Sequence, residues 1–356
     1  MSRRVVLRSP SGDSLVRHVS AGVWAEATNT PTETIGEGLW AIPGLVDAHA
    51  HLAGESLPLD GRPGDLGYAT AQAKDALAAG VTLLFDKGWC DETTLDLIDS
   101  VAPGDRPEIE AAGRMLAVEG GYYPGFAEEI PAEEIGEGVR RRGGGRARWV
   151  KLIGDWPRRG EGPKANFDEG HLREAVEAAN SLGVRLAIHT MARDVPSMAV
   201  AAGVHSIEHG LFLSEDDLDP LVRSDGVWVP TVRRVEETIA SLREGSSGQR
   251  LLREGLQNVR RVLPLAIEAG VTVLAGTDLA GSSAEVAREA LRLASLGITP
   301  AAVLEIVGMK GHEVAGRSGR FALGEPADAV FFSDNPAEDL EVLAHPVHVM
   351  RLGQAR

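Results

Sequence analysis

Residues 181–189 read Ser-Leu-Gly-Val-Arg-Leu-Ala-Ile-His, and this stretch contains the structural unit that the chain repeats. An amphipathic helix ends at Gly183, a short apolar strand follows, and His189 closes the strand. Glycine ends helices well because it adopts the left-handed conformation that other residues avoid. The same succession of helix, glycine and strand recurs at Gly80, Gly203 and Gly270. Alternating helices and strands predict an α/β fold with a parallel sheet.

Eight apolar strands can be placed in this alternation, and eight such units favour a closed (β/α)8 barrel of the TIM type over an open sheet. The predicted strands are 44–48, 81–85, 108–112, 149–153, 185–188, 204–207, 227–230 and 272–275. We expect the barrel to span residues 44–316. Two connections, 113–148 and 231–249, are long, and long loops on a barrel commonly carry binding residues.

Both ends of the chain have short β-prone segments in place of this alternation. The predicted strands are 5–7, 14–18 and 22–24 near the N-terminus and 329–332 and 347–352 near the C-terminus. Gly, Ser and Asp turn residues separate the N-terminal ones. We therefore expect residues 1–43 and 317–356 to form one small β-sandwich-like unit beside the barrel.

The composition excludes several classes of partner. The 356 residues carry 36 Lys and Arg against 52 Asp and Glu, a formal charge of −16. Nucleic acids and anionic membranes bind basic surfaces, so we expect neither as a partner. The charge does not identify the substrate, which we expect to be a small molecule. The single cysteine, Cys90, excludes an intrachain disulfide. No apolar run reaches membrane length and no signal-peptide core follows the basic N-terminus, so we expect a cytoplasmic protein and leave a homo-oligomer open.

Side chains that can bind metal recur where the predicted strands end. They are His49 and His51 after strand one, Lys151 in strand four, His189 after strand five, His209 after strand six and Asp278 after strand eight. Residues two apart in a strand face the same way, so the first two imidazoles should lie together. Barrel enzymes build their active sites at the carboxyl ends of the strands. The sequence therefore predicts a metal site at that face.

Lys151 is the least expected of these residues. It lies within the apolar run Trp-Val-Lys-Leu-Ile at 149–153. A buried ammonium is costly unless it is paired or chemically altered. Asp47 and Glu208 lie close to predicted ligands, and we expect them to support the ligands instead of binding metal themselves.

The segment 42–52, Ile-Pro-Gly-Leu-Val-Asp-Ala-His-Ala-His-Leu, resembles the strand-one signature of the amidohydrolase superfamily. Later segments resemble its branch of imidazolonepropionase-like proteins and metal-dependent Xaa-Pro dipeptidases (prolidase-like). These segments are Gly-Val-Thr at 80–82, Ser-Ile-Glu-His-Gly at 206–210, Gly-Thr-Asp at 276–278 and Gly-Glu-Pro-Ala-Asp-Ala at 324–329. Together they cover nearly the whole chain in the family's order.

The resemblance implies two divalent metal ions, with zinc as the expected metal, bridged by carbamylated Lys151 and a hydroxide. It places His49, His51, Lys151 and Asp278 around the more buried ion, and Lys151, His189 and His209 around the other. It gives Asp278 the role of general base and then general acid in hydrolysis of an amide-type C–N bond.

Three alternatives remain open at this point. A mononuclear deaminase or imidazolonepropionase-like cyclic amide hydrolase would carry Glu where Ala192 stands, and it would have no use for Lys151, so the binuclear hydrolase is favoured. A lactonase, esterase or carbamate hydrolase would use the same metals on another bond. A catalytically inactive barrel used as a binding module would have a broken ligand set, whereas this set is complete.

Members of this branch often cleave dipeptides or N-acyl amino acids, whose free carboxylate pairs well with arginine. The candidate substrate-binding residues in the loops are Arg193, Tyr122, Tyr123, Arg233 and Arg234. The segments 87–89 and 189–193 depart from the family's usual pattern, with Lys87 standing where small or hydrophobic residues are more common. These departures leave the scissile bond open.

Overall fold

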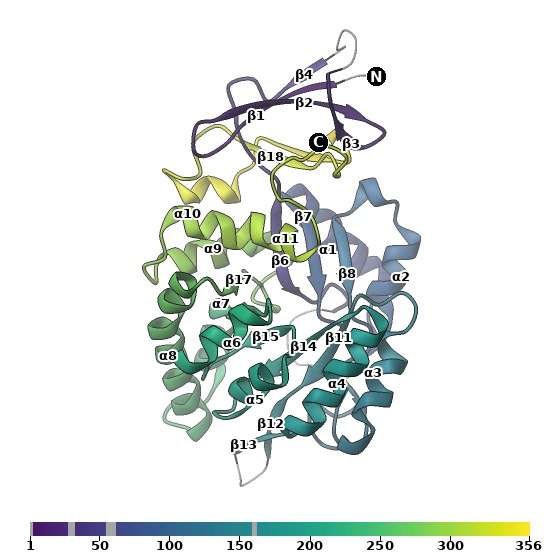
Figure 1. Ribbon diagram of the computed structural model, residues 1–356, viewed down its shortest axis with the longest axis vertical. Helices are drawn as coiled ribbons and strands as arrows, with labels where there is room; N and C mark the ends of the chain where they lie inside the picture. Colours follow the sequence, from purple (N-terminus) through teal and green to yellow (C-terminus); the bar gives the residue numbers. More distant parts are fainter. Residues whose placement is uncertain (1–2, 28–32, 55–61, 159–161) are drawn as a thin grey trace.

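The computed structural model describes residues 3–27, 33–54, 62–158 and 162–356. A barrel of strands and helices makes up most of the molecule, and a sheet built from both ends of the chain covers one end of it (Figure 1). The fold is α/β with parallel sheets, as the alternation predicted.

The barrel strands are β6 (Leu45–Ala50), β7 (Val81–Asp86), β8 (Glu108–Ala111), β11 (Trp149–Ile153), β14 (Arg185–Thr190), β15 (Ser206–His209), β16 (Val227–Val229) and β17 (Thr272–Val273). They pair in parallel as β6-β7-β8 and as β11-β14-β15-β16-β17. Backbone hydrogen bonds join the two groups on both sides. Arg148 N–H donates to the Ala111 carbonyl at 2.9 Å, and Ala48 N–H donates to the Ala275 carbonyl at 2.8 Å. The eight strands therefore follow one another around a common core.

This interior core consists of apolar side chains contributed by strands on every side. Phe85, Trp149, Ala187, Val227 and Leu274 all belong to one buried cluster. The Phe85 and Trp149 rings lie 5.3 Å apart between centroids. The barrel interior is therefore packed with apolar side chains toward the shared sheet, and polar side chains collect at the carboxyl ends of the strands.

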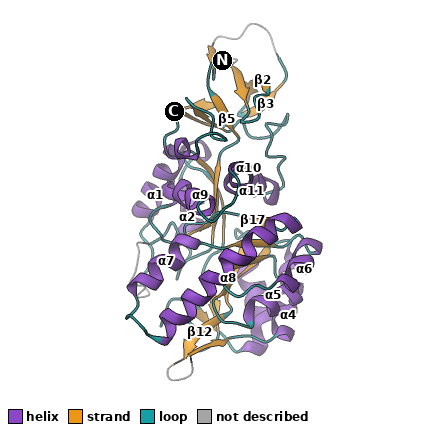
Figure 2. Cartoon of the chain, turned by 90° about the vertical axis from the view of Figure 1, so that its left-hand side faces the viewer, coloured by secondary structure: helices purple, strands orange, loops and turns teal. Residues whose placement is uncertain are grey.

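Helices cover the outside of the strands (Figure 2). They are α1 (Leu66–Ala78), α2 (Thr93–Ser100), α3 (Ile135–Gly143), α4 (Glu169–Leu182), α5 (Val195–Ala202), α6 (Leu218–Arg223), α7 (Val232–Ser241), α8 (Ser247–Ala269), α9 (Val286–Ala294), α10 (Pro300–Leu304) and α11 (Lys310–Val314). Three of them end where the sequence predicts, at Gly183, Gly203 and Gly270, which have φ of 67°, 81° and 90°. These glycines supply the left-handed conformation that turns each helix toward the next strand.

The two ends of the chain share one mixed sheet. Its strands are β1 (Arg3–Arg8), β2 (Ser14–Ser20), β3 (Val23–Ala25), β4 (Glu33–Ile35), β5 (Trp40–Ile42), β18 (Ala329–Phe332), β19 (His348–Arg351) and β20 (Gln354–Ala355). Antiparallel pairing of β5 with β18, with Ile42 opposite Val330, joins the N-terminal part to the C-terminal part. A bridge between Val23 and Pro326 brings β3 back to the segment before β18, so the sheet curls over its own apolar cluster, which includes Trp24 and Phe331.

The connections contain structure that the sequence did not predict. Residues 113–148 include β9 (Leu116–Ala117), β10 (Glu128–Glu129) and α3, and most of 231–249 is helix α7. A hairpin of β12 (Asp155–Arg158) and β13 (Gly162–Ala165) follows β11 and lies at the end of the molecule opposite the shared sheet (Figure 1). The sixth barrel strand runs two residues later than expected, so His209 is its last residue.

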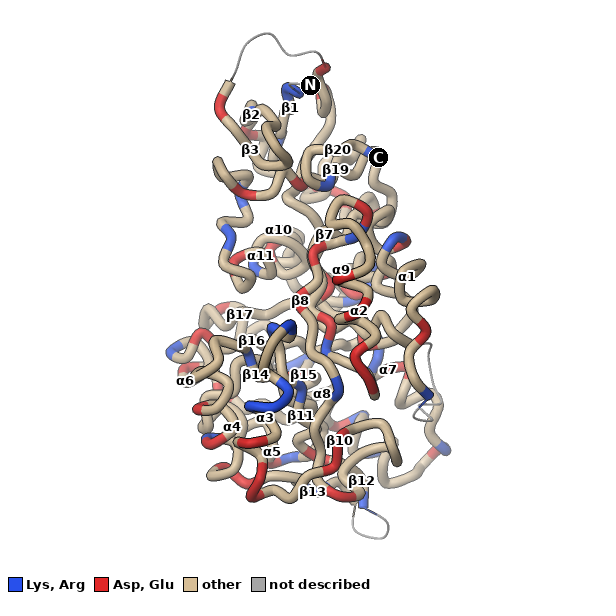
Figure 3. The backbone as a smooth tube through the Cα atoms, turned by 90° about the vertical axis from the view of Figure 1, so that its right-hand side faces the viewer, with Lys and Arg blue, Asp and Glu red and all other residues tan. Residues whose placement is uncertain are grey.

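Acidic and basic positions are interspersed along the surface elements (Figure 3). The arginines of α3 illustrate the pattern, because Arg141 and Arg142 both pair with Glu128. Within the described residues, no helix is both long enough and apolar enough to span a bilayer.

Candidate metal centre

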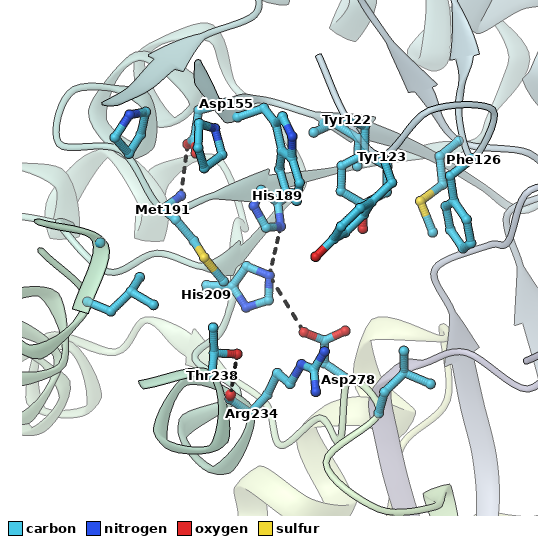
Figure 4. Close-up of a pocket in the computed structure, with 18 of the residues that line it drawn as sticks. Tyr122, Tyr123, Phe126, Asp155, His189, Met191, His209, Arg234, Thr238 and Asp278 are labelled. Atoms are coloured by element: carbon cyan, nitrogen blue, oxygen red, sulfur yellow. Dashed lines mark hydrogen bonds and ion pairs between the residues drawn. The ribbon is translucent and has the colours of Figure 1, made fainter. Parts of the chain in front are cut away.

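The predicted ligands meet at the carboxyl ends of the barrel strands, on the floor of a cavity of about 850 Å³. His49, His51, Lys151, His189, His209 and Asp278 all line this cavity. Figure 4 shows His189, His209 and Asp278 pointing toward one another from separate strand ends. A cavity of this size is typical of a site for a small organic molecule.

His49, His51 and Asp278 form the first cluster of ligand atoms. Asp278 Oδ1 lies 3.4 Å from His49 Nε2 and 3.3 Å from His51 Nε2. Donor atoms around a four-coordinate zinc ion with bonds of 2.0–2.1 Å lie about 3.4 Å apart. The three side chains can therefore hold one ion with little rearrangement.

The other nitrogen of each imidazole is also engaged, which sets the direction of the ligand nitrogen. His51 Nδ1 lies 2.6 Å from the Gly88 carbonyl, and His49 Nδ1 lies 2.7 Å from Glu208 Oε2. An acceptor at Nδ1 favours the tautomer that keeps the proton there, and Nε2 then presents its lone pair. Both Nε2 atoms face Asp278.

The Asp47 carboxylate lies beside the ligands without facing them, because it accepts a hydrogen bond from the His49 backbone N–H at 3.1 Å. Pairing with β7 shifts between Asp47 and Ala50, which is the mark of a β-bulge. Bulges redirect side chains and are common beside active sites. The Asp47 carboxylate also accepts hydrogen bonds from the Thr277 backbone and hydroxyl at 3.0 and 2.6 Å. It thereby anchors the segment that carries Asp278.

His189 and His209 form the second cluster. His209 Nε2 lies 3.0 Å from His189 Nδ1 and 3.8 Å from Asp278 Oδ2. His209 Nδ1 lies 2.7 Å from the Thr231 hydroxyl, which leaves Nε2 directed at the cavity. Asp278 is therefore shared between the two clusters.

Three residues of the centre have positive φ, namely His209 at 65°, Thr231 at 43° and Asp278 at 44°. Residues other than glycine adopt this region at a cost, and such strain concentrates at functional sites. The barrel holds these residues in the conformation that turns their side chains inward.

Lys151 lies beside both clusters, and no described residue pairs with its amine. Its side chain is 2% exposed, and its Nζ has no hydrogen-bond partner among the described residues. Burial lowers its pKa to about 8. An unpaired amine in this position fits a group that becomes an anionic oxygen ligand on reaction with carbon dioxide.

The electrostatics of the cluster also suit a metal. Burial lowers the pKa of His49 to about 4 and that of His209 to about 3, so the imidazoles are neutral near pH 7. Burial opposes ionisation of Asp278, but the surrounding histidines and Arg234 hold its pKa well below the usual value. Neutral imidazoles around a carboxylate are the protonation states that metal ligands require.

Three of the five candidate substrate residues line the cavity and two do not. Tyr122, Tyr123 and Arg234 lie in its wall, and Figure 4 shows Arg234 beside Asp278. Arg193 is exposed and pairs with Glu254. Arg233 pairs with Glu285 at 3.3 Å. Neither Arg193 nor Arg233 lines the cavity, so the structure brings only Arg234 of the three predicted arginines to the site.

The sequence did not indicate that the cavity wall is aromatic. Tyr122 and Tyr123 each lie 4.7 Å from Trp156 between ring centroids, and Trp89 lies 4.6 Å from Phe126. Trp89 comes from the loop after β7, Trp156 from the hairpin, and the others from the long connection after β8. We call these five side chains the aromatic wall. The one sequence feature that could have predicted the aromatic wall is the concentration of aromatic residues in segments that follow strands.

Gly276 provides a test of how tightly the centre is packed. A Cβ at this position would lie 2.6 Å from His49 Cβ and 2.9 Å from His49 N. We expect Gly276→Ala to displace His49, lowering metal content and reducing stability by about 1–3 kcal/mol. Gly144→Ala, whose Cβ would meet nothing closer than 3.4 Å, is the matched control. Metal analysis and denaturant unfolding of both variants check this, and unchanged metal content in Gly276→Ala would contradict it.

Comparison with known proteins agrees with this geometry. The family model described as the amidohydrolase family matches residues 40–356. An uncharacterised protein of Mycobacterium tuberculosis is 33% identical over 342 residues, covering 90% of this chain and 86% of that protein. The ochratoxinase of Aspergillus niger is 24% identical over 367 residues, covering 88% of this chain and 75% of that protein.

Among solved structures, a Xaa-Pro dipeptidase with bound methionine superposes over 100% of both chains, with a TM-score of 0.85 and 21% identity. The A. niger ochratoxinase structure has a TM-score of 0.83 and 19% identity, covering 99% of this chain and 95% of that one. These likenesses establish the fold. The chain belongs to the amidohydrolase family and is a hydrolase that acts on carbon–nitrogen bonds.

Proposed function

We propose that this chain is a binuclear metal-dependent hydrolase that cleaves the amide bond of a dipeptide or an N-acyl amino acid. The observation that carries the proposal is the convergence of four imidazoles, Asp278 and unpartnered Lys151 at one end of a cavity that also contains a guanidinium. His49, His51 and Asp278 would hold one ion, and His189 and His209 the other, with carbamylated Lys151 between them. Zinc is the metal we expect from this donor set.

Ions bound there would supply Lewis-acid polarisation of the scissile carbonyl and would acidify water. The chain's own residues perform the remaining tasks. Asp278 is ionised, lies within 3.4 Å of two imidazole nitrogens, and has an oxygen available to accept a proton from the attacking water. The same oxygen returns that proton to the leaving nitrogen, which must be protonated before it can depart as an amine.

Arg234 and the aromatic wall would bind different parts of the substrate. The guanidinium lies close enough to Asp278 to lower its pKa, so a carboxylate held by Arg234 would place the adjacent amide bond near the ligand clusters. The aromatic wall offers apolar surface for the acyl part and excludes water from it. Its extent favours a substrate whose acyl part is large and apolar.

Metal analysis and a substrate panel test the proposal together. Two equivalents of metal per chain are expected, whereas one would support the mononuclear alternative and none the inactive barrel. The panel contains dipeptides, N-acyl amino acids, lactones, esters and carbamates, each assayed with metal-loaded protein. Turnover of lactones or carbamates without turnover of any amide would overturn the amide assignment.

Arg234→Met is expected to raise KM for substrates with a free carboxylate by roughly 10- to 100-fold, because a hydrogen-bonded charge pair contributes about 1.5–3 kcal/mol. Their carboxamide analogues should lose little, since they do not offer the guanidinium a charge. Arg233→Met is the matched control, because Arg233 pairs with Glu285 outside the cavity. Steady-state kinetics on acid and amide pairs provide the measurement, and equal losses on both would remove the assigned role.

A further inference from the structure

Two buried charged residues in the barrel are not used by the proposed chemistry. Lys87 follows β7 and Glu208 lies in β15, and both side chains are 0% exposed. The Lys87 ammonium lies 3.2 Å from Glu208 Oε1 and 3.5 Å from the centre of the Trp149 ring. Lys87 does not line the cavity, so it has no route to the substrate. It lies between the apolar interior and the ligand clusters.

Glu208 connects this lysine to a predicted ligand. Its Oε2 lies 2.7 Å from His49 Nδ1, and its Oε1 accepts a hydrogen bond of 2.6 Å from the Ser206 hydroxyl. His49 Nε2, on the other side of the ring, faces Asp278 Oδ1 at 3.4 Å. A continuous series of contacts therefore runs from Lys87 through Glu208 to the nitrogen that faces the cavity.

The ion pair explains how a carboxylate can be kept at this depth. An unpaired buried carboxylate is strongly disfavoured, and a neutral imidazole cannot balance its charge. Lys87 supplies the balancing charge, and the face of Trp149 stabilises the ammonium from another side. Without Lys87, Glu208 Oε1 would keep only the Ser206 hydroxyl as a partner, and Oε2 would no longer be fixed against His49 Nδ1.

We propose that Lys87 is a positioning residue that acts through Glu208 to hold His49 in the tautomer whose Nε2 binds metal. The two buried lysines then have different tasks: Lys87 is ion-paired and supports a ligand, whereas Lys151 is unpartnered and becomes one. This inference rests on the proposed metal site, but its central observable, the tautomer of His49, exists in the metal-free protein.

The first experiment measures that tautomer directly. Protein labelled with ¹⁵N-histidine and freed of metal is studied by long-range ¹H–¹⁵N correlation, with His49 assigned by its loss in His49→Asn. The native protein should show the Nδ1–H form, and Lys87→Met should show a mixture of tautomers. Val46→Ala, a substitution of another apolar residue in the same interior core, should keep the native signal. A native signal in folded Lys87→Met would overturn the proposal.

The second experiment asks whether Lys87 acts through Glu208. Competition with a chelator should show Zn²⁺ bound roughly 10- to 100-fold more weakly by Lys87→Met. Added to Glu208→Gln, the same substitution should cost little more, because the carboxylate that needs the ammonium is already gone. If Lys87→Met weakened Zn²⁺ binding equally in the native protein and in Glu208→Gln, Lys87 would not act through Glu208. If the native protein bound no metal, the proposed function would fail, while the tautomer measurement would still decide the role of Lys87.

Discussion

Asp278→Asn is expected to lower kcat/KM by about 10³-fold or more, the largest effect of any single substitution in this chain. Asparagine retains the shape of the side chain but removes both the charge and the proton acceptor. General acid–base groups alone contribute roughly 10²- to 10⁴-fold. Asp278 also lies within 4 Å of three imidazoles from both clusters, so the charge that would attract either ion is lost as well.

Metal content and turnover are measured on the same preparations to separate these two effects. If Asp278→Asn keeps its metal, the rate loss reports proton transfer; if it loses metal, the ligand role dominates. Asp168→Asn is the matched control, since Asp168 caps α4 and asparagine caps helices equally well. Activity within tenfold of the native protein in Asp278→Asn would refute both roles.

Lys151→Met is expected to have the second largest effect. Metal content should fall below two equivalents, and turnover should fall by about as much as in Asp278→Asn. Methionine fills nearly the same space, so the apolar surroundings in β11 remain packed. What is lost is the amine. In the proposed centre the neutral amine would attack carbon dioxide with formation of a C–N bond and release of a proton to water, and the resulting anionic carbamate would supply oxygen ligands for metal.

Carbon dioxide itself provides an independent check on Lys151. Metal loading of the native protein from buffer depleted of carbon dioxide should be poorer than loading in bicarbonate, and Lys151→Met should show no such difference. Lys74→Met, at an exposed site on α1, controls for loss of a lysine. Full metal content in Lys151→Met would remove the carbamate from the proposal.

The strand ends could be predicted from sequence because two local signals coincide there. Glycines that end helices mark where each strand begins, and polar residues after apolar runs mark where it stops. Barrel geometry then gathers those ends on one face, so residues as distant along the chain as His49 and Asp278 could be grouped by sequence alone. The register shift in β6 between Asp47 and Ala50 has no clear sequence signature, so the sequence could not show that the Asp47 carboxylate bonds to Thr277 and to the His49 backbone.

Other features of the cavity depend on contacts that local sequence does not encode. Arg233 and Arg234 are equivalent as sequence, but α7 begins at Val232 and successive helical residues point about 100° apart, so only one faces the cavity. The β12–β13 hairpin contains two prolines, and proline argues against a strand. Lys87 follows a strand as many surface lysines do, and its partner Glu208 comes from the opposite half of the barrel.

The join between the first and last barrel strands has a consequence for how the protein matures. Asp278 N–H donates to the His49 carbonyl at 2.8 Å, so the residue that closes the ring is itself a predicted ligand. During synthesis, His49 emerges more than two hundred residues before Asp278. A nascent chain that still lacks the last strand carries most of the ligands but not the carboxylate shared between the clusters. Stable binding of both metal ions would therefore occur only after the last strand has closed the barrel. The bound ions would then stabilise the closed barrel.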